Sequence, residues 1–143
     1  MLPTAARIID LPSFPDARGH LGVVEVAQHI GFTIERAFYI YNTPSHAHRG
    51  GHAHKTLYQF LITLGAPIAF RVHNGQQETA FTLNSYTQGL YLPPRHWIDI
   101  DSIPTNTTLL VLCSAPYDEA DYLRDFSAFL AYNASLATSI KNG

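Results

Sequence analysis

Two closely spaced histidines near the middle of the chain, His52 and His54, could transfer protons or bind a metal ion. Only Ala53 separates them, so in an extended segment both imidazoles point to the same side. Arg49 and Lys55 flank the pair with positive charge. Imidazole accepts and donates protons near neutral pH and is also a common metal ligand. The pair therefore indicates a proton-transfer site, a metal site or plain packing.

The residues just before the pair shape its backbone. Gly50 and Gly51 allow a tight turn or a close approach of the backbone to a ligand. His46 and His48 precede them, and we interpret these two as residues of a surface loop.

Length and composition predict one packed domain over residues 1–143. Hydrophobic residues make up 46 % of the chain and charged residues 14 %, a balance typical of a globular protein with a sizeable core. The formal net charge of −2 gives no support to nucleic-acid or membrane-surface binding. No apolar run approaches the ~20 residues of a membrane span, and we see no signal peptide, so we expect a cytoplasmic protein. Cys113, the single cysteine, excludes an intrachain disulfide and is interpreted as a buried hydrophobe.

Short apolar runs between turn residues predict a chain made mostly of strands. These runs are residues 7–11, 21–26, 32–41, 57–64, 68–72, 78–83, 89–92, 97–100 and 107–113. Asn74-Gly75 is a strong hairpin signal. After residue 118 the apolar residues recur at helical spacing. This predicts a C-terminal helix over 119–133 with Asp118 as its cap and a frayed tail after it. The expected fold is all-β, a β-barrel or jelly roll with one short C-terminal helix.

The stretch around the histidines resembles the first motif of the cupin superfamily, in which two histidines and a glutamate usually bind a divalent metal. The resemblance rests on the two glycines, His52-x-His54, a polar residue at 59 and Gly65. Here the glutamate position holds Gln59, a poor metal ligand. The histidine of the second cupin motif falls on Ile98, with His96 two residues earlier as a weak substitute. We therefore expect no metal, because a catalytic zinc site normally has three protein ligands.

Four longer strings resemble a smaller cupin family, the nucleotide-sugar 3,4-ketoisomerases. They are Asp16-x-Arg18-Gly19-x-Leu21, Arg49-Gly50-x-His52-Ala53-His54-Lys55, Gly89-Leu90-Tyr91, and Tyr117-Asp118-Glu119-x-Asp121-Tyr122-x-Arg124. The resemblance implies a single-domain cupin that acts on dTDP-4-keto-6-deoxyglucose without metal or other cofactor. It also implies a homodimer whose N-terminal strands, within residues 1–30 here, are exchanged between subunits.

The histidines suit that reaction independently of the resemblance. Moving a ketone from C4 to C3 requires removal of a proton from C3, an enediol, and return of a proton to C4. Two imidazoles can do this, each proton transfer contributing typically ~10²–10⁴-fold in rate. We interpret His54 as the group that moves the carbon-bound proton and His52 as the group that serves the oxygens, although the reverse assignment is equally open. Gln59 can hydrogen-bond the sugar.

Cationic side chains are the candidates for binding the diphosphate. Arg18 and Arg49 carry guanidinium groups that match phosphate oxygens, and surface ion pairs are the alternative for both. Lys55 is a further candidate, or else a solvated charge.

Two aromatic residues complete the candidate site. Tyr39 resembles a family tyrosine near the sugar, and the alternative is a packed barrel tyrosine. Trp97 could stack on thymine or belong to the core. We interpret the string over 117–124 as structural, the start of a helix that packs on the barrel or on the partner.

The sequence thus predicts a metal-independent isomerase that converts dTDP-4-keto-6-deoxyglucose to a dTDP-3-keto-6-deoxyhexose, a step toward 3-amino sugars. The alternatives are a metal-dependent cupin oxygenase, a non-catalytic sugar-binding cupin, and an epimerase acting on a related dTDP-sugar. The stereochemistry at C4, galacto or gluco, and the nucleotide base stay open.

Overall fold

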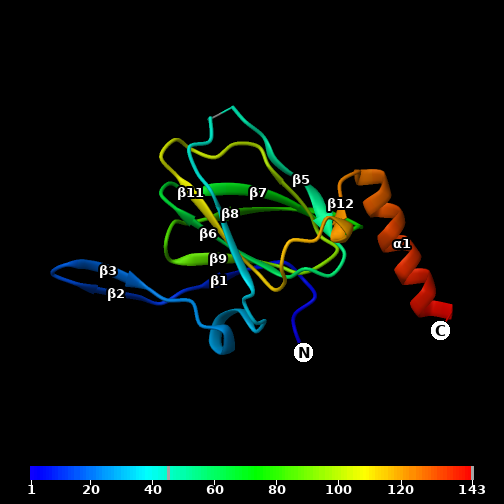
Figure 1. The fold of residues 1–143 in the computed structure, drawn as a ribbon, viewed down its shortest axis with the longest axis horizontal. Coiled ribbons are helices and arrows are strands. Elements are labelled where there is room, and N and C mark those ends of the chain that lie inside the picture. The colour runs from blue at the N-terminus through cyan, green and yellow to red at the C-terminus, as the bar shows by residue number, and fades with distance from the viewer. Residues whose placement is uncertain (45, 143) are drawn as a thin grey trace.

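Two antiparallel sheets form the body of the protein. A computed structural model describes residues 1–44 and 46–142, with side-chain surroundings up to residue 138. Among these, one sheet has the order β1 (Arg7–Asp10), β9 (Gln88–Leu92), β6 (Gln59–Leu64), β11 (Thr108–Cys113), β4 (Arg36–Ile40). The other has the order β12 (Tyr122–Leu123), β5 (Arg49–His54), β10 (Trp97–Ile100), β7 (Ile68–His73), β8 (Glu78–Leu83). Figure 1 shows them wrapped into a barrel, which confirms the predicted β architecture.

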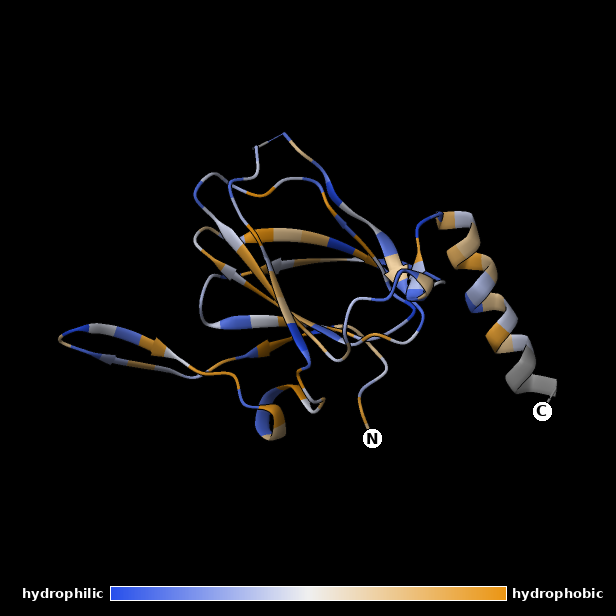
Figure 2. Cartoon of the chain, viewed as in Figure 1, coloured by the Kyte–Doolittle hydropathy of each residue, from blue (hydrophilic) through white to orange (hydrophobic). Residues whose placement is uncertain are grey.

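The space between the sheets holds the main apolar core. Alternation along β11 turns Leu109, Val111 and Cys113 inward, as expected for strands with one face toward a core. Phe70 and Leu83, on β7 and β8, complete the cluster from the other sheet, both 0 % exposed. The barrel strands carry much of the hydrophobic colour in Figure 2. In the described part of the chain, no helix has the length and apolar character needed to cross a membrane.

The N-terminal region differs from the predicted strand over 21–26. Instead β2 (Ser13–Asp16) and β3 (Gly19–Gly22) form a hairpin, followed by a single π-helical turn, Val26–Ile30. Asp16 closes the hairpin by accepting hydrogen bonds from the backbone and guanidinium of Arg18. The hairpin projects away from the barrel and all residues of its two strands are exposed (Figure 1).

The C-terminal helix starts later than predicted. Asp118 caps only the 3-10 turn Glu119–Asp121, accepting from the backbone of Ala120. The chain then forms β12, which pairs with the free edge of β5, and this pairing is the physical reason that the helix over 119–133 was a wrong prediction. Helix α1 (Phe126–Asn142) follows and extends through the expected frayed tail. Its Phe129 packs on the outer face of the second sheet.

A bulge in β5 sets the direction of the histidines. Gly50 and Gly51 both have positive φ, 83° and 74°, where the β5–β10 register shifts between Ile98 and Asp99. A Cβ on Gly50 would lie 2.6 Å from the carbonyl oxygen of Ile98, so only glycine fits.

Gly50→Ala is expected to lower the free energy of unfolding by about 3 kcal/mol, because the side chain would combine positive-φ strain with a backbone clash. Gly19→Ala is the matched control, since Gly19 has φ +125° but a Cβ there meets nothing within 4 Å. Urea unfolding followed by circular dichroism measures both. Equal losses would contradict the close approach of β5 and β10.

Candidate active site

The two histidines of β5 face the barrel interior. Ala53 between them is 0 % exposed and packs outward against the cluster beneath α1, so its neighbours point the other way. His52 pairs across the sheet with Ile98, a residue of the inner core. The His52 and His54 ring centroids are 5.3 Å apart with an interplanar angle of 86°. The prediction that both imidazoles share one face is confirmed.

A carboxylate fixes the orientation of His54. Its Nδ1 lies 3.0 Å from Oδ2 of Asp121, while Oδ1 of Asp121 accepts from the amide and hydroxyl of Thr56, each at 2.8 Å. A carboxylate partner keeps the proton on Nδ1, which leaves Nε2 as the basic nitrogen. That Nε2 is buried and has no hydrogen-bond partner among the described residues.

Asp121 is the functional residue that the sequence analysis missed. It lies within the string over 117–124, which we interpreted as structural. The repeated acidic residues of that string were the available signal, but nothing local in the sequence connects position 121 with position 54. The contact arises because β12 pairs with the end of β5, Tyr122 opposite His54.

Aromatic and charged side chains cover the pair. The Tyr122 ring centroid lies 4.3 Å from that of His54 and 5.3 Å from that of His52. The Arg124 guanidinium stacks 4.1 Å from the Tyr122 centroid and forms an ion pair with Glu119 at 2.7 Å. The segment after β11 is therefore a wall of the site as well as a structural element.

Burial keeps both imidazoles neutral. It lowers the pKa of His54 to about 4, helped by the neighbouring His52 and opposed by the Asp121 carboxylate. Burial also lowers the pKa of His52. At neutral pH the pair can therefore accept protons.

The wall opposite the histidines combines three strands of the first sheet. Cys113 on β11 pairs with Arg36 on β4 and with Gln59 on β6, so the three side chains lie in a row. Gln59 is 5 % exposed and its amide lies 3.9 Å from Cys113 Sγ. Burial raises the pKa of the Cys113 thiol, which is therefore an inert hydrophobe as expected. A cavity of about 60 Å³ is lined by Arg36, His54 and Tyr122.

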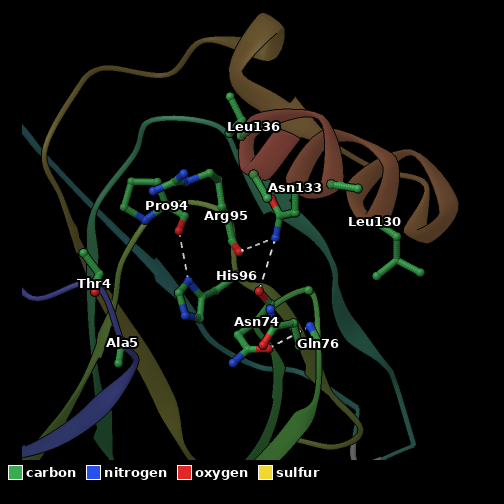
Figure 3. A pocket seen from close by; sticks show the side chains of 13 residues that line it. Thr4, Ala5, Asn74, Gln76, Pro94, Arg95, His96, Leu130, Asn133 and Leu136 are labelled. Atoms are coloured by element: carbon green, nitrogen blue, oxygen red, sulfur yellow. Dashed lines mark hydrogen bonds between the residues drawn. The ribbon is translucent and has the colours of Figure 1, made fainter. Parts of the chain in front are cut away.

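The described residues do not form the cupin metal site. No group of three or more His, Cys, Asp and Glu side chains among them could hold an ion. The weak substitute His96 lines a different crevice, of about 510 Å³, beneath α1. Figure 3 shows its Nδ1 hydrogen-bonded to the carbonyl of Pro94, at 2.9 Å. In the same view Asn133 of α1 donates to the carbonyl of Arg95, at 3.2 Å.

Tyr39 does not lie beside the histidines of its own chain, which corrects our expectation. The alternation of β4 turns Arg36, Phe38 and Ile40 inward, whereas Tyr39 is 63 % exposed on the outer face. Its ring lies 5.8 Å from that of Tyr41. Alternation in the sequence correctly separated the two faces of β4, but it did not show which face is turned toward the site.

Trp97 belongs to the core. It is 8 % exposed and packs against Phe126 and Phe129 beneath α1, with Nε1 donating to Asp99 at 3.0 Å. These contacts correct the suggestion that its ring stacks on a base.

The three candidate cations lie apart from the histidines' inner face. Arg18 forms an ion pair with Asp16 at the hairpin tip, its side chain 90 % exposed. Arg49 is exposed at the start of β5. The Lys55 Nζ lies 5.7 Å from the ring centroid of Tyr132 on α1.

Comparison with known proteins identifies one family. Its model, described as FdtA: WxcM-like, C-terminal, matches residues 4–134. The chain is 34 % identical over 130 residues to the TDP-4-oxo-6-deoxy-alpha-D-glucose-3,4-oxoisomerase of Aneurinibacillus thermoaerophilus, covering 91 % of this chain and 94 % of that protein.

Solved structures agree with this match. A histidine-to-asparagine variant of the 3,4-ketoisomerase QdtA from Thermoanaerobacterium thermosaccharolyticum, in complex with TDP-4-keto-6-deoxyglucose, superposes with a TM-score of 0.85 at 32 % identity, over 92 % of this chain and 95 % of that chain. A 3,4-ketoisomerase from Helicobacter canadensis gives a TM-score of 0.85 at 33 % identity, over 89 % and 96 % of the two chains.

Stability should fall as pH drops from about 6.5 toward 4, because the unfolded chain binds a proton at His54 that the folded chain excludes. His54→Asn removes this titration. Between pH 6.5 and pH 4, the free energy of unfolding of the variant should therefore fall by up to about 3 kcal/mol less than that of the wild type. Urea titrations at several pH values measure the difference. His20→Asn, on the exposed hairpin, controls for loss of an imidazole. Parallel pH profiles for wild type and His54→Asn would contradict a buried neutral His54.

Proposed function

The chain belongs to the FdtA (WxcM-like, C-terminal) family and is a sugar-nucleotide 3,4-ketoisomerase, and we propose that its substrate is dTDP-4-keto-6-deoxyglucose. The product is then a dTDP-3-keto-6-deoxyhexose. One observation carries the chemistry: a buried neutral His54, held at Nδ1 by Asp121, presents Nε2 beside a second imidazole. Such a pair can move protons at adjacent carbon and oxygen atoms.

In the proposed mechanism His54 acts at carbon. Its Nε2 takes the proton from C3, the C–H electron pair forms the C3=C4 double bond, and the carbonyl at C4 becomes an enediolate oxygen. Asp121 stabilises the resulting imidazolium, as carboxylates do for catalytic histidines. His54 then returns a proton to C4.

His52 acts at oxygen. It takes the proton from the hydroxyl at C3 and gives one to the oxygen at C4, so that the ketone appears at C3. C3 is oxidised and C4 is reduced by the same two electrons, so no external oxidant or reductant is required. Gln59, on the opposite wall, hydrogen-bonds the sugar in this proposal.

Substrate entry requires the cover of the site to move. The cavity beside His54, about 60 Å³, is far below the ~300–1,000 Å³ typical of ligand pockets. Tyr122 and the exposed Glu119–Arg124 ion pair are the side chains over the histidines, and they must separate to admit a hexose. The diphosphate then lies outside the barrel, where we propose that Arg49 and Lys55 bind it, together with Arg18 from the exchanged hairpin of the second subunit.

We infer a dimer formed through the N-terminal hairpin. Phe14 and Leu21 pair across β2 and β3 and are 57 % and 59 % exposed, an apolar patch with no cover from its own barrel. A second copy of the chain supplies that cover, as exposed apolar strands commonly mark a subunit contact. We propose that this dimer is cytoplasmic.

The exchange experiment tests the mechanism. In deuterated buffer after chelator treatment, wild type should incorporate deuterium and form the 3-keto product from dTDP-4-keto-6-deoxyglucose, read by NMR. His54→Asn should abolish exchange at C3, and Asp121→Asn should slow it about 10²–10⁴-fold because the imidazole loses its tautomer and orientation. His52→Asn should slow product formation more than exchange.

Each other outcome excludes part of the proposal. Exchange that survives in both histidine variants contradicts the assignment of the pair. A retained C4 ketone with inverted C3 or C5 identifies an epimerase, and binding without exchange identifies a sugar-binding protein. Activity lost on chelation and restored by one metal identifies a metal enzyme.

The double variant Phe14→Ser, Leu21→Ser should shift the protein from dimer to monomer, because it removes the apolar patch of the hairpin. Sedimentation velocity over a concentration series measures the change. Tyr41→Ser, at a residue that is 60 % exposed just after β4, is the control and should stay dimeric. A monomeric wild type, or a dimeric double variant, would contradict the inferred interface.

A further inference from the structure

Arg36 is a cation inside the barrel to which the mechanism so far gives no role. It lies on the inward face of β4, opposite Cys113 in the β4–β11 register. With His54 and Tyr122 it lines the cavity described above. Its guanidinium carbon lies 5.4 Å from the ring centroid of Phe38 and 5.7 Å from that of Tyr117, so aromatic rings hold it in place.

The charge of Arg36 is not neutralised within the described part of the chain. No carboxylate there forms an ion pair with it, and its Nε is buried without a hydrogen-bond partner. The polar residues beside it in the sheet are Gln59 and Cys113, both neutral. Two carboxylates line the same cavity and both have other partners: Asp121 is engaged by His54 and Thr56, and Asp118 accepts from the backbone of Ala120. Arg36 is partly buried, and a cation that is partly removed from water without a counter-ion, with its Nε unpartnered, is costly. Such a group indicates that an anion occupies the site at some stage.

The reaction supplies such an anion. Removal of the C3 proton places negative charge on the oxygen at C4, inside a site whose histidines are neutral. In a low-dielectric site, a fixed donor or cation directed at developing charge is a large contribution to catalysis. Lysine could lose its proton when buried, whereas arginine stays charged, so arginine is the suitable residue for this place.

We propose that Arg36 is a catalytic residue that binds the enediolate oxygen during the ketone shift. This inference rests on the proposed function. The guanidinium carries no proton in the reaction; it stabilises the oxyanion and returns to its free state when the C3 ketone forms. Its positive charge also disfavours protonation of His54 before substrate arrives, which keeps that imidazole competent as a base.

The competing role for Arg36 is to bind the diphosphate. The two roles differ in the step that they affect. A side chain that binds the diphosphate stabilises the bound substrate and the transition state equally, so its removal raises KM and the Kd for dTDP. A side chain that binds the enediolate acts only when negative charge develops on the oxygen at C4, so its removal lowers kcat and leaves dTDP binding unchanged.

The experiment compares Arg36→Met and Arg36→Lys with Arg7→Met, a control at the exposed first residue of β1. Arg36→Met should lower both kcat and the rate of deuterium exchange at C3 about 10²–10³-fold, with KM and the Kd for dTDP changed less than about threefold. Arg36→Lys should recover part of kcat. Without the guanidinium charge, the pKa of His54 measured by NMR should rise, and Arg7→Met should match wild type throughout.

Three results would overturn the assignment. They are Arg36→Met with kcat within about threefold of wild type, Arg36→Met with dTDP affinity lost and kcat kept, and an Arg36→Lys variant no more active than Arg36→Met. If Arg36→Met does not fold, Arg36→Lys with the same measurements decides, a loss of kcat alone supporting the proposal. A wild type that shows no exchange overturns the proposed function itself, whereas an active wild type with an active Arg36→Met overturns only the role of Arg36.

Discussion

The contact between His54 Nδ1 and the Asp121 carboxylate is the interaction on which the site depends. It joins positions 67 residues apart. It exists because the chain pairs with the free edge of β5 four residues after Asp118, at Tyr122, instead of continuing as a helix. The same carboxylate holds Thr56, so the end of β5, the 3-10 turn and β12 form one rigid corner. Helix α1 covers that corner from outside through Phe129.

Burial of this corner determines the protonation state of the pair. Desolvation lowers the pKa values of His52 and His54 further than Asp121 raises that of His54, so the carboxylate orients the imidazole without charging it. A neutral ring with one nitrogen tied and the other free is a directional proton acceptor. The Gly50–Gly51 bulge contributes the remaining constraint, because it lets β5 approach β10 closely enough to turn His52 inward.

Local patterns predicted the strands and the shared face of the histidines well, because period-2 alternation and turn residues are properties of short segments. The strands over 78–83 and 97–100 agree with β8 and β10 to the residue, and Asn74 closes the predicted hairpin. Features set by long-range pairing were missed. The helix predicted after Asp118 exists, but it begins only at Phe126. The contact of Asp121 with His54 depends on the edge strand β12, which no local sequence pattern reveals. Tyr39 was placed on the wrong face because alternation alone cannot tell inside from outside.

The replacement of glutamate by Gln59 has two consequences in this barrel. It removes a metal ligand, and it also leaves the row Arg36, Cys113, Gln59 without a negative charge. A glutamate at 59 would place a carboxylate in the same row as Arg36, separated from it only by Cys113. With glutamine there, the guanidinium repels a divalent cation from the neighbouring imidazoles and attracts an oxyanion instead. In our proposal, the residue that stands where cupins usually have a metal-binding glutamate is therefore also the one that leaves a cation free to stabilise an enediolate.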